Sequence, residues 1–212
     1  MPRFSGIALL AAFAAGCAQG PGAPAGGASA ARGAVSLQGL PASFESTQDC
    51  CVRVTLNLRP DGAYAVRQVL GPSEFYDFGR WQLSAADGLL FLEGGRDAAR
   101  YLVAPPDTLE AQDGTQGGDL KRKPQLEELR GPFRLNGFYD GATFKECRTG
   151  LAWPVDDSRA GGSLKQDYQN SVPGKAGRPA LVSIDARFVI SEGREEVRIQ
   201  RLPAILDATA CP

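Results

Sequence analysis

An alternating run of apolar and polar residues from position 52 constrains the fold more than any other feature. The apolar positions of this run are Val52, Val54, Leu56 and Leu58. A period of two is typical of a strand with one buried and one exposed face. Pro-Asp-Gly at 60–62 comes next, where Pro presets φ and Gly accepts a positive φ. Since residues 63–69 are strand-like again, the segment predicts a β-hairpin.

Further short strands are expected through the rest of the first half. They lie at residues 79–84, 89–93, 100–103 and 108–111. Gly- and Pro-containing breaks separate them, and no helical period is present. Many short strands joined by tight turns indicate an up-and-down meander that closes as a small, lipocalin-like β-barrel over residues 36–112. The polar, Gly-rich residues 113–125 are interpreted as a linker.

The second half, residues 126–212, has a different element order. Three strands are expected at 133–138, 143–147 and 152–155. Ser163 is placed to cap a short helix that buries Leu164, Tyr168 and Val172 and ends at Pro173-Gly174. Strands at 180–190 and 197–201 follow. Three strands, a helix and two strands is the order of an OB-fold, although a plain α+β roll would share it. The fold class is therefore mainly β.

The N-terminus carries a targeting signal. Arg3 precedes a short apolar run that ends in Ala14-Ala15-Gly16-Cys17. A bilayer-spanning helix needs about 20 apolar residues, so this run is too short to span and is typical of a secretory signal peptide. The ending resembles a bacterial lipobox, which predicts removal of residues 1–16 and lipidation of Cys17. The alternative is an ordinary secretory signal cut near Ala15, with Cys17 incidental.

Residues 17–35 are interpreted as a lipidated cysteine followed by a flexible tether. The segment after Cys17 is almost entirely Ala, Gly and Pro. Such a composition has no hydrophobic period and little to bury. Ala18 stands where an Asp acts as an inner-membrane retention signal in enterobacterial lipoproteins. By that resemblance, the expected location is the outer membrane, with the protein facing the periplasm.

Composition excludes several classes of function. The net charge is −1, so nothing favours nucleic acid, and Lys121-Arg122-Lys123 is a short cluster typical of a solvated linker. Histidine is absent, and the single methionine is Met1. Without histidine the usual general base and the commonest metal ligand are missing. We therefore expect no enzymatic activity and no His- or Met-rich copper site.

Four cysteines remain after Cys17, and they allow three disulfide connectivities. They are Cys50, Cys51, Cys147 and Cys211. The first two are adjacent, and adjacent cysteines pair only through a strained ring. Their two thiolates could instead ligate a soft metal such as Cu(I), while the simpler reading is that they bind nothing.

Several segments together resemble a known family. They are residues 40–45, 54–58, 61–64 and 78–81 in the first half, and Phe144-Lys145-Glu146-Cys147-Arg148-Thr149-Gly150 in the second. This pattern resembles the copper-resistance and envelope-stress lipoprotein family of the NlpE type. The resemblance covers about residues 36–212 and implies a lipocalin-like domain followed by an OB-like domain. It also implies a disulfide between Cys147 and Cys211, which would tie down the end of the chain.

The resemblance implies a stress-reporting role, in which the protein signals to a membrane histidine kinase and takes part in copper homeostasis. The adjacent Cys50 and Cys51 depart from the family's Cys-x-x-Cys, so Cu(I) ligation by this pair is a tentative expectation. Two alternatives stay open: a carrier of a small apolar ligand inside the first barrel, and a structural scaffold of the envelope.

Overall fold

The structure is a computed structural model. It describes residues 35–47, 52–95, 98–104, 106–156, 164–201, 204–206 and 208–212. Residues 32–212 form one compact unit. Among the described residues, none of the helices is both long and apolar enough to cross a membrane.

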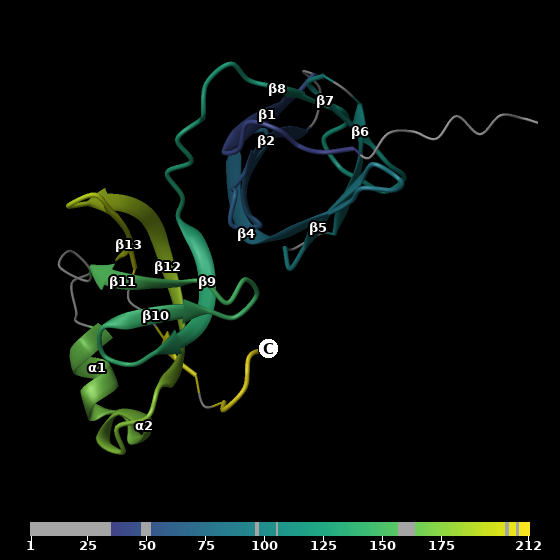
Figure 1. Ribbon diagram of the computed structural model, residues 1–212. Helices are drawn as coiled ribbons and strands as arrows, with labels where there is room; N and C mark the ends of the chain where they lie inside the picture. Colours follow the sequence, from purple (N-terminus) through teal and green to yellow (C-terminus); the bar gives the residue numbers. More distant parts are fainter. Residues whose placement is uncertain are drawn as a thin grey trace, which may run out of the picture. The chain divides into compact units, whose positions relative to one another are not determined.

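The first part of this unit is a closed β-barrel whose strands follow one another in chain order (Figure 1). Its strands are β1 (Ala42–Ser46), β2 (Val52–Leu58), β3 (Ala63–Leu70), β4 (Ser73–Ser84), β5 (Leu89–Glu93), β6 (Ala99–Ala104), β7 (Thr108–Ala111) and β8 (Leu120–Arg122). Every neighbouring pair is antiparallel, and β1 pairs with β8 to close the ring. The expected up-and-down barrel is confirmed.

The hairpin of β2 and β3 forms as the sequence predicts. Leu58 of β2 lies opposite Tyr64 of β3. Gly62 has a φ of 82°, and the Asp61 carboxylate accepts a hydrogen bond from the Ala63 amide at 3.1 Å. The apolar side chains of β2 point inward, where Leu56 and Leu58 are fully buried. The local turn and the alternation of apolar and polar residues are therefore enough to set the register between β2 and β3.

The linker expected at residues 113–125 is wrong in part, because it contains β8. Leu120 is fully buried in the first barrel, and Lys121 lies opposite both Glu45 of β1 and Thr108 of β7. The connection to the next domain instead follows β8, from residue 123 to residue 132. A strand of three residues is too short to show a period, so its closing role is invisible in the sequence.

The second part of the unit is an OB-type barrel. Its elements are β9 (Phe133–Tyr139), β10 (Thr143–Glu146), β11 (Ala152–Asp156), α1 (Leu164–Asn170), α2 (Val172–Lys175), β12 (Ala180–Ser191), β13 (Arg194–Ile199) and β14 (Ala204–Ile205). β12 pairs with both β9 and β13, and β13 runs parallel to β11, which closes the ring. The helices lie between β11 and β12, as the expected OB order requires.

The helix differs from its prediction at its C-terminal end. Leu164 and Tyr168 are buried as expected, but Val172 is 76 % exposed. α1 ends at Asn170, and Ser171 caps a separate turn, α2, by accepting a hydrogen bond from the Gly174 amide at 3.1 Å. Pro173 has no amide hydrogen for a continuing helix but fits the first turn of a new one. Ser163 lies outside the described residues.

Candidate functional site

A disulfide joins Cys147, just after β10, to Cys211 at the end of the chain. Their Cα atoms are 5.6 Å apart, and 64 positions separate them in sequence. The Cys147 amide also donates to the carbonyl oxygen of Asn136 at 2.8 Å. The pairing that the family resemblance implied is confirmed, and it fastens the C-terminus to the second barrel.

The turn after Cys147 is built around a buried carboxylate. Glu146 is 2 % exposed, and its Oε2 accepts hydrogen bonds from the amide and the hydroxyl of Thr149, at 2.7 and 2.9 Å. A buried carboxylate is costly unless such donors satisfy it. These bonds fix the turn from residue 146 to residue 149 next to the disulfide.

Arg148, within that turn, connects the two barrels. Its Nη1 donates to Asp77 Oδ1 at 2.9 Å and to the Phe78 carbonyl oxygen at 3.0 Å, both in β4 of the first barrel. The sequence marked Arg148 as part of the family-like turn but not as a connection to the first barrel. The residue beside the disulfide is therefore also a docking residue.

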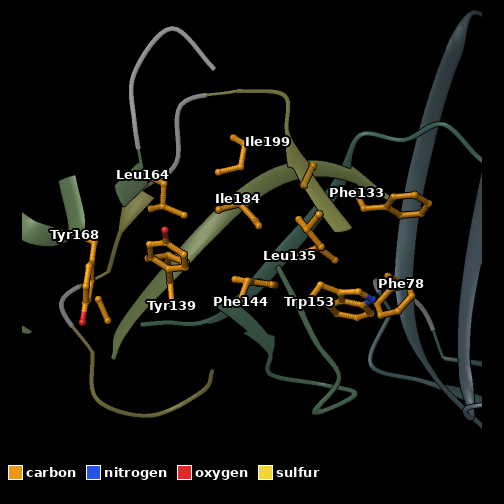
Figure 2. Close-up of a cluster of buried hydrophobic side chains, with 14 of the residues drawn as sticks. Phe78, Phe133, Leu135, Tyr139, Phe144, Trp153, Leu164, Tyr168, Ile184 and Ile199 are labelled. Atoms are coloured by element: carbon orange, nitrogen blue, oxygen red, sulfur yellow. The ribbon is translucent and has the colours of Figure 1, made fainter. Parts of the chain in front are cut away.

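Phe78 joins the core of the second barrel although it belongs to the first. Its ring lies 5.0 Å from that of Phe188, 5.8 Å from Trp153 and 6.4 Å from Phe133, measured between centroids. Figure 2 shows Phe78 beside Trp153 at one end of the buried cluster. Phe78 is 1 % exposed, so water is excluded from its contact with these rings. Aromatic pairs of this geometry add about 0.5–1.5 kcal/mol each beyond area burial.

A second polar contact between the barrels joins Arg59, just after β2, to Glu195 of β13. Arg59 Nη1 and Nη2 donate to the two carboxylate oxygens of Glu195 at 2.7 and 2.9 Å. Trp153 Nε1 donates to Glu195 Oε2 at 2.7 Å, and Trp81 Nε1 donates to the Arg59 carbonyl at 2.9 Å. Burial lowers the pKa of Arg59, but its hydrogen bonds to Glu195 and Asp61 outweigh that effect and leave the pKa raised.

A groove of about 750 Å³ opens beside this ion pair, and we name it the connection groove. The end of β2 and the residues after it, the chain between the barrels, and one segment of β12 line it; these segments are 57–61, 126–130 and 187–190. Its size lies within the range of about 300–1,000 Å³ that is usual for small-molecule sites. The sequence gives no sign of this groove, because its walls come from segments far apart in the chain.

The interior of the first barrel, by contrast, is filled. Leu56, Leu90, Tyr101, Leu109 and Leu120 are among its buried side chains. A cavity of about 40 Å³ remains beside Tyr64 and Tyr101. That space holds a water molecule or two but no apolar ligand of useful size. Burial raises the pKa of the Tyr101 hydroxyl to about 12.

The remaining site residues predicted from sequence lie outside the described residues. They are Cys17, the expected lipidation site, and Cys50 and Cys51, the tentative Cu(I) ligands. Within the described ranges, no group of three or more His, Cys, Asp or Glu side chains is arranged to hold a metal ion.

Comparison with known proteins supports the description of the second barrel as an OB domain. Residues 124–201 match the family model of the NlpE C-terminal OB domain. Among solved structures, the Cpx pathway activator NlpE from Escherichia coli is 20 % identical, with a TM-score of 0.36, 81 % of this chain covered and 98 % of that chain. A candidate lipoprotein from Shewanella oneidensis is 22 % identical, with a TM-score of 0.32 and coverages of 40 % and 90 %. No curated protein sequence matches the chain.

The family match covers the β9–β13 barrel, which has the strand order and the parallel β11–β13 pair of an OB-fold. The closed first barrel precedes it, as the sequence resemblance implied. Over residues 124–201, the chain therefore carries a domain that matches the NlpE C-terminal OB domain.

Proposed function

We propose that the protein is a non-enzymatic lipoprotein of the cell envelope that reports redox or envelope stress to a membrane sensor histidine kinase. The match of residues 124–201 to the NlpE C-terminal OB domain supports this role. The observation that carries the proposal is the adjacency of the Cys147–Cys211 disulfide to Arg148, the residue that docks onto the first barrel. One chemical event at the disulfide therefore reaches the contact between the barrels.

The signal would arise when the disulfide is not formed. When disulfide formation fails, Cys147 and Cys211 remain two thiols, so the chain end is not fastened to the turn that carries Arg148. Loss of a native disulfide in a small domain typically costs about 2–5 kcal/mol. The turn then loosens, Arg148 leaves Asp77, and the first barrel exposes a surface that the kinase recognises.

A stress reporter in live cells tests this role. Cys211→Ser should raise kinase-dependent output in oxidising medium, and Arg148→Ala should do so with the disulfide intact. Arg100→Ala is the matched control, since Arg100 is exposed on β6 and far in sequence from the disulfide. Unchanged output from both variants, at equal protein amount, would leave the scaffold alternative in place.

The location belongs to the same proposal. A lipid on Cys17 would hold the protein at the outer membrane, facing the periplasm, with the Ala/Gly/Pro segment as a tether. Cys17→Ala should release the protein from the membrane fraction and block signal removal at that site. Continued fractionation of this variant with the outer membrane would contradict the anchor.

Copper binding is a subsidiary proposal. Cys50 and Cys51 are adjacent thiols in a first domain that has no histidine, and soft thiolates prefer Cu(I). A Cys50→Ser, Cys51→Ser variant should lose Cu(I) affinity in a colorimetric competition assay. Equal affinity in both proteins would mean that this pair binds no copper.

The carrier alternative finds little support in the first barrel. The cavity of about 40 Å³ beside Tyr64 and Tyr101 is too small for an apolar ligand. A pocket of about 310 Å³ beside Phe44, Val103 and Leu109 is where a small ligand would have room. A lipocalin-like carrier requires an open interior, and the Leu and Tyr side chains fill this one.

A further inference from the structure

The connection groove has an apolar wall that solvent reaches. Leu129, Phe133, Phe188 and Val189 line it. Leu126 and Ile190, also on its wall, are 56 % and 72 % exposed. Apolar side chains that line a groove of this size are typical of small-molecule sites.

The acidic groups in the groove already have partners. Asp61 and Glu195 both bind Arg59, with shortest N–O distances of 2.8 and 2.7 Å. Glu128 lies 3.4 Å from Arg130. The groove therefore contains no carboxylate that lacks a cation.

Arg187 is the exception among the charged groups. Its Nε is buried and has no hydrogen-bond partner. Its cross-strand neighbour on β13 is another cation, Arg198, which is itself paired with Asp156. No ion pair joins Arg187 to any described residue. A buried, unpaired guanidinium donor is costly, and an anion restores its hydrogen bonds.

We infer that the connection groove binds a single-chain anionic amphiphile of the fatty-acid class, with its carboxylate on Arg187 and its alkyl chain along the apolar wall. The groove offers one unpaired cation, Arg187, and its other wall is aliphatic and aromatic. This arrangement matches a ligand with one anionic head and one uncharged tail. This site lies outside the barrel interior and does not depend on the redox role.

Two other occupants fit less well. An extended peptide usually binds by adding a strand to a free sheet edge. β2 offers no such edge, because it pairs with β1 and β3. Residues 187–190 of β12 pair with β13 alone, so a peptide at that edge is the competing outcome that the test below must exclude. The chain's own residues 18–34 contain no Asp or Glu, so they carry no side-chain anion for Arg187.

The test uses the mature chain, residues 17–212, carrying Cys17→Ala and expressed without residues 1–16, so that it has neither the lipid nor the apolar signal segment. Dodecanoate is titrated while tryptophan fluorescence is recorded, since Trp81 and Trp153 bond to Arg59 and Glu195 at the groove. We expect saturable 1:1 binding. Dodecanol, which lacks the charge, should bind at least about tenfold more weakly. Tetradecanoate should bind about tenfold more tightly, because each buried methylene contributes about 0.8 kcal/mol.

Two variants separate the groove from other apolar surfaces. Arg187→Gln should weaken dodecanoate binding at least about tenfold, and Arg100→Gln, at an exposed position on β6, should leave it unchanged. Ile190→Asp places a like charge at a site that is already 72 % exposed and should weaken binding without affecting the fold. Equal affinity in the parent and in both groove variants would overturn the inference. So would the absence of saturable binding, or selective binding of an acidic peptide instead of dodecanoate.

Discussion

Arg59 and Glu195, 136 positions apart, form a two-point ion pair between the barrels, with N–O distances of 2.7 and 2.9 Å. Both side chains are about one-quarter exposed, and Glu195 also accepts from the Trp153 indole. Such partly buried, geometrically matched pairs are worth more than exposed ones, because water screens them less.

Glu195→Ala should therefore destabilise the protein by about 1–3 kcal/mol, since it leaves the Trp153 indole N–H without an acceptor and Arg59 with Asp61 as its remaining carboxylate partner. Guanidinium unfolding followed by tryptophan fluorescence measures this change. Glu196→Ala, at the next position of β13, is the matched control and should cost less than about 0.5 kcal/mol. Equal losses in the two variants would show that the pair has no special role.

Phe78→Ala should uncouple the barrels. Phe78 fills space among Phe133, Trp153 and Phe188, so its removal leaves a cavity and should cost about 3–5 kcal/mol. We expect unfolding to separate into two transitions and protease cleavage between residues 123 and 132 to accelerate. Phe75→Ala, on the same strand but 38 % exposed, should leave a single transition. A single transition in Phe78→Ala as well would argue against this coupling.

Removing the disulfide should weaken the second barrel selectively. Cys147 and Cys211 close a loop of 64 positions, which corresponds to about 4 kcal/mol in the loop-entropy model. In Cys211→Ser, proteolysis should cut first within residues 126–212, while hydrogen exchange in β2 and β3 stays slow. Adding reductant to this variant should change nothing further. A variant as resistant as the oxidised parent would refute the redox mechanism.

Stability should fall in acid below about pH 4 because two carboxylates lose their partners. Burial raises the pKa of Asp61, but hydrogen bonds from Arg59 and the Ala63 amide outweigh it and leave the pKa lowered. The hydrogen bond from Lys123 lowers the pKa of Glu127. A carboxylate whose pKa is lower in the folded state stabilises the fold above its unfolded pKa, and this contribution disappears as the pH falls through the folded value.

Asp61→Asn and Glu127→Gln should therefore lower the melting temperature slightly at pH 7 and flatten its decline between about pH 5 and pH 2. Differential scanning calorimetry across this range measures both effects. Asp113→Asn, at an exposed position after β7, is the control and should leave the pH profile as it is. A steeper acid decline in either carboxylate variant would mean that the sign of the pKa shift is wrong.

The sequence by itself determined the parts of the fold that depend on local patterns. The alternation in 52–58 and the turn at 60–62 predict β2, β3 and their register, because both signals lie within a few neighbouring residues. The order of strands and helix predicts the OB-type barrel for the same reason. The Cys147–Cys211 pairing came from the family-like turn and the terminal cysteine, since four cysteines alone leave three pairings open.

Three strands and one helix boundary escaped these local rules; one of the strands, β14, has only two residues and is too short to show a period. β1 has no alternation, because Ala42, Ser43 and Phe44 are all buried; the Ser43 hydroxyl bonds to Asn57 and to the Glu127 amide of the connecting chain. β8 is too short to show a period. Leu164, Tyr168 and Val172 are spaced four residues apart, which predicted one helix that reaches Val172. Instead, Ser171 caps a new helical turn, so α1 ends before Val172.

Only the tertiary structure decided the contacts between the barrels. In the sequence, Phe78 stands just before the strand expected at 79–84 and shows no sign of a distant partner, yet its ring fills the core of the other barrel. Arg59, Arg148 and Arg187 look alike as exposed cations in a sequence. Their surroundings separate them: Arg59 binds two carboxylates, Arg148 binds Asp77, and Arg187 forms no ion pair with any described residue. Local sequence patterns indicate which residues are buried. Contacts between residues more than 50 positions apart form only when the closed barrels bring their surfaces together, so local patterns cannot predict them.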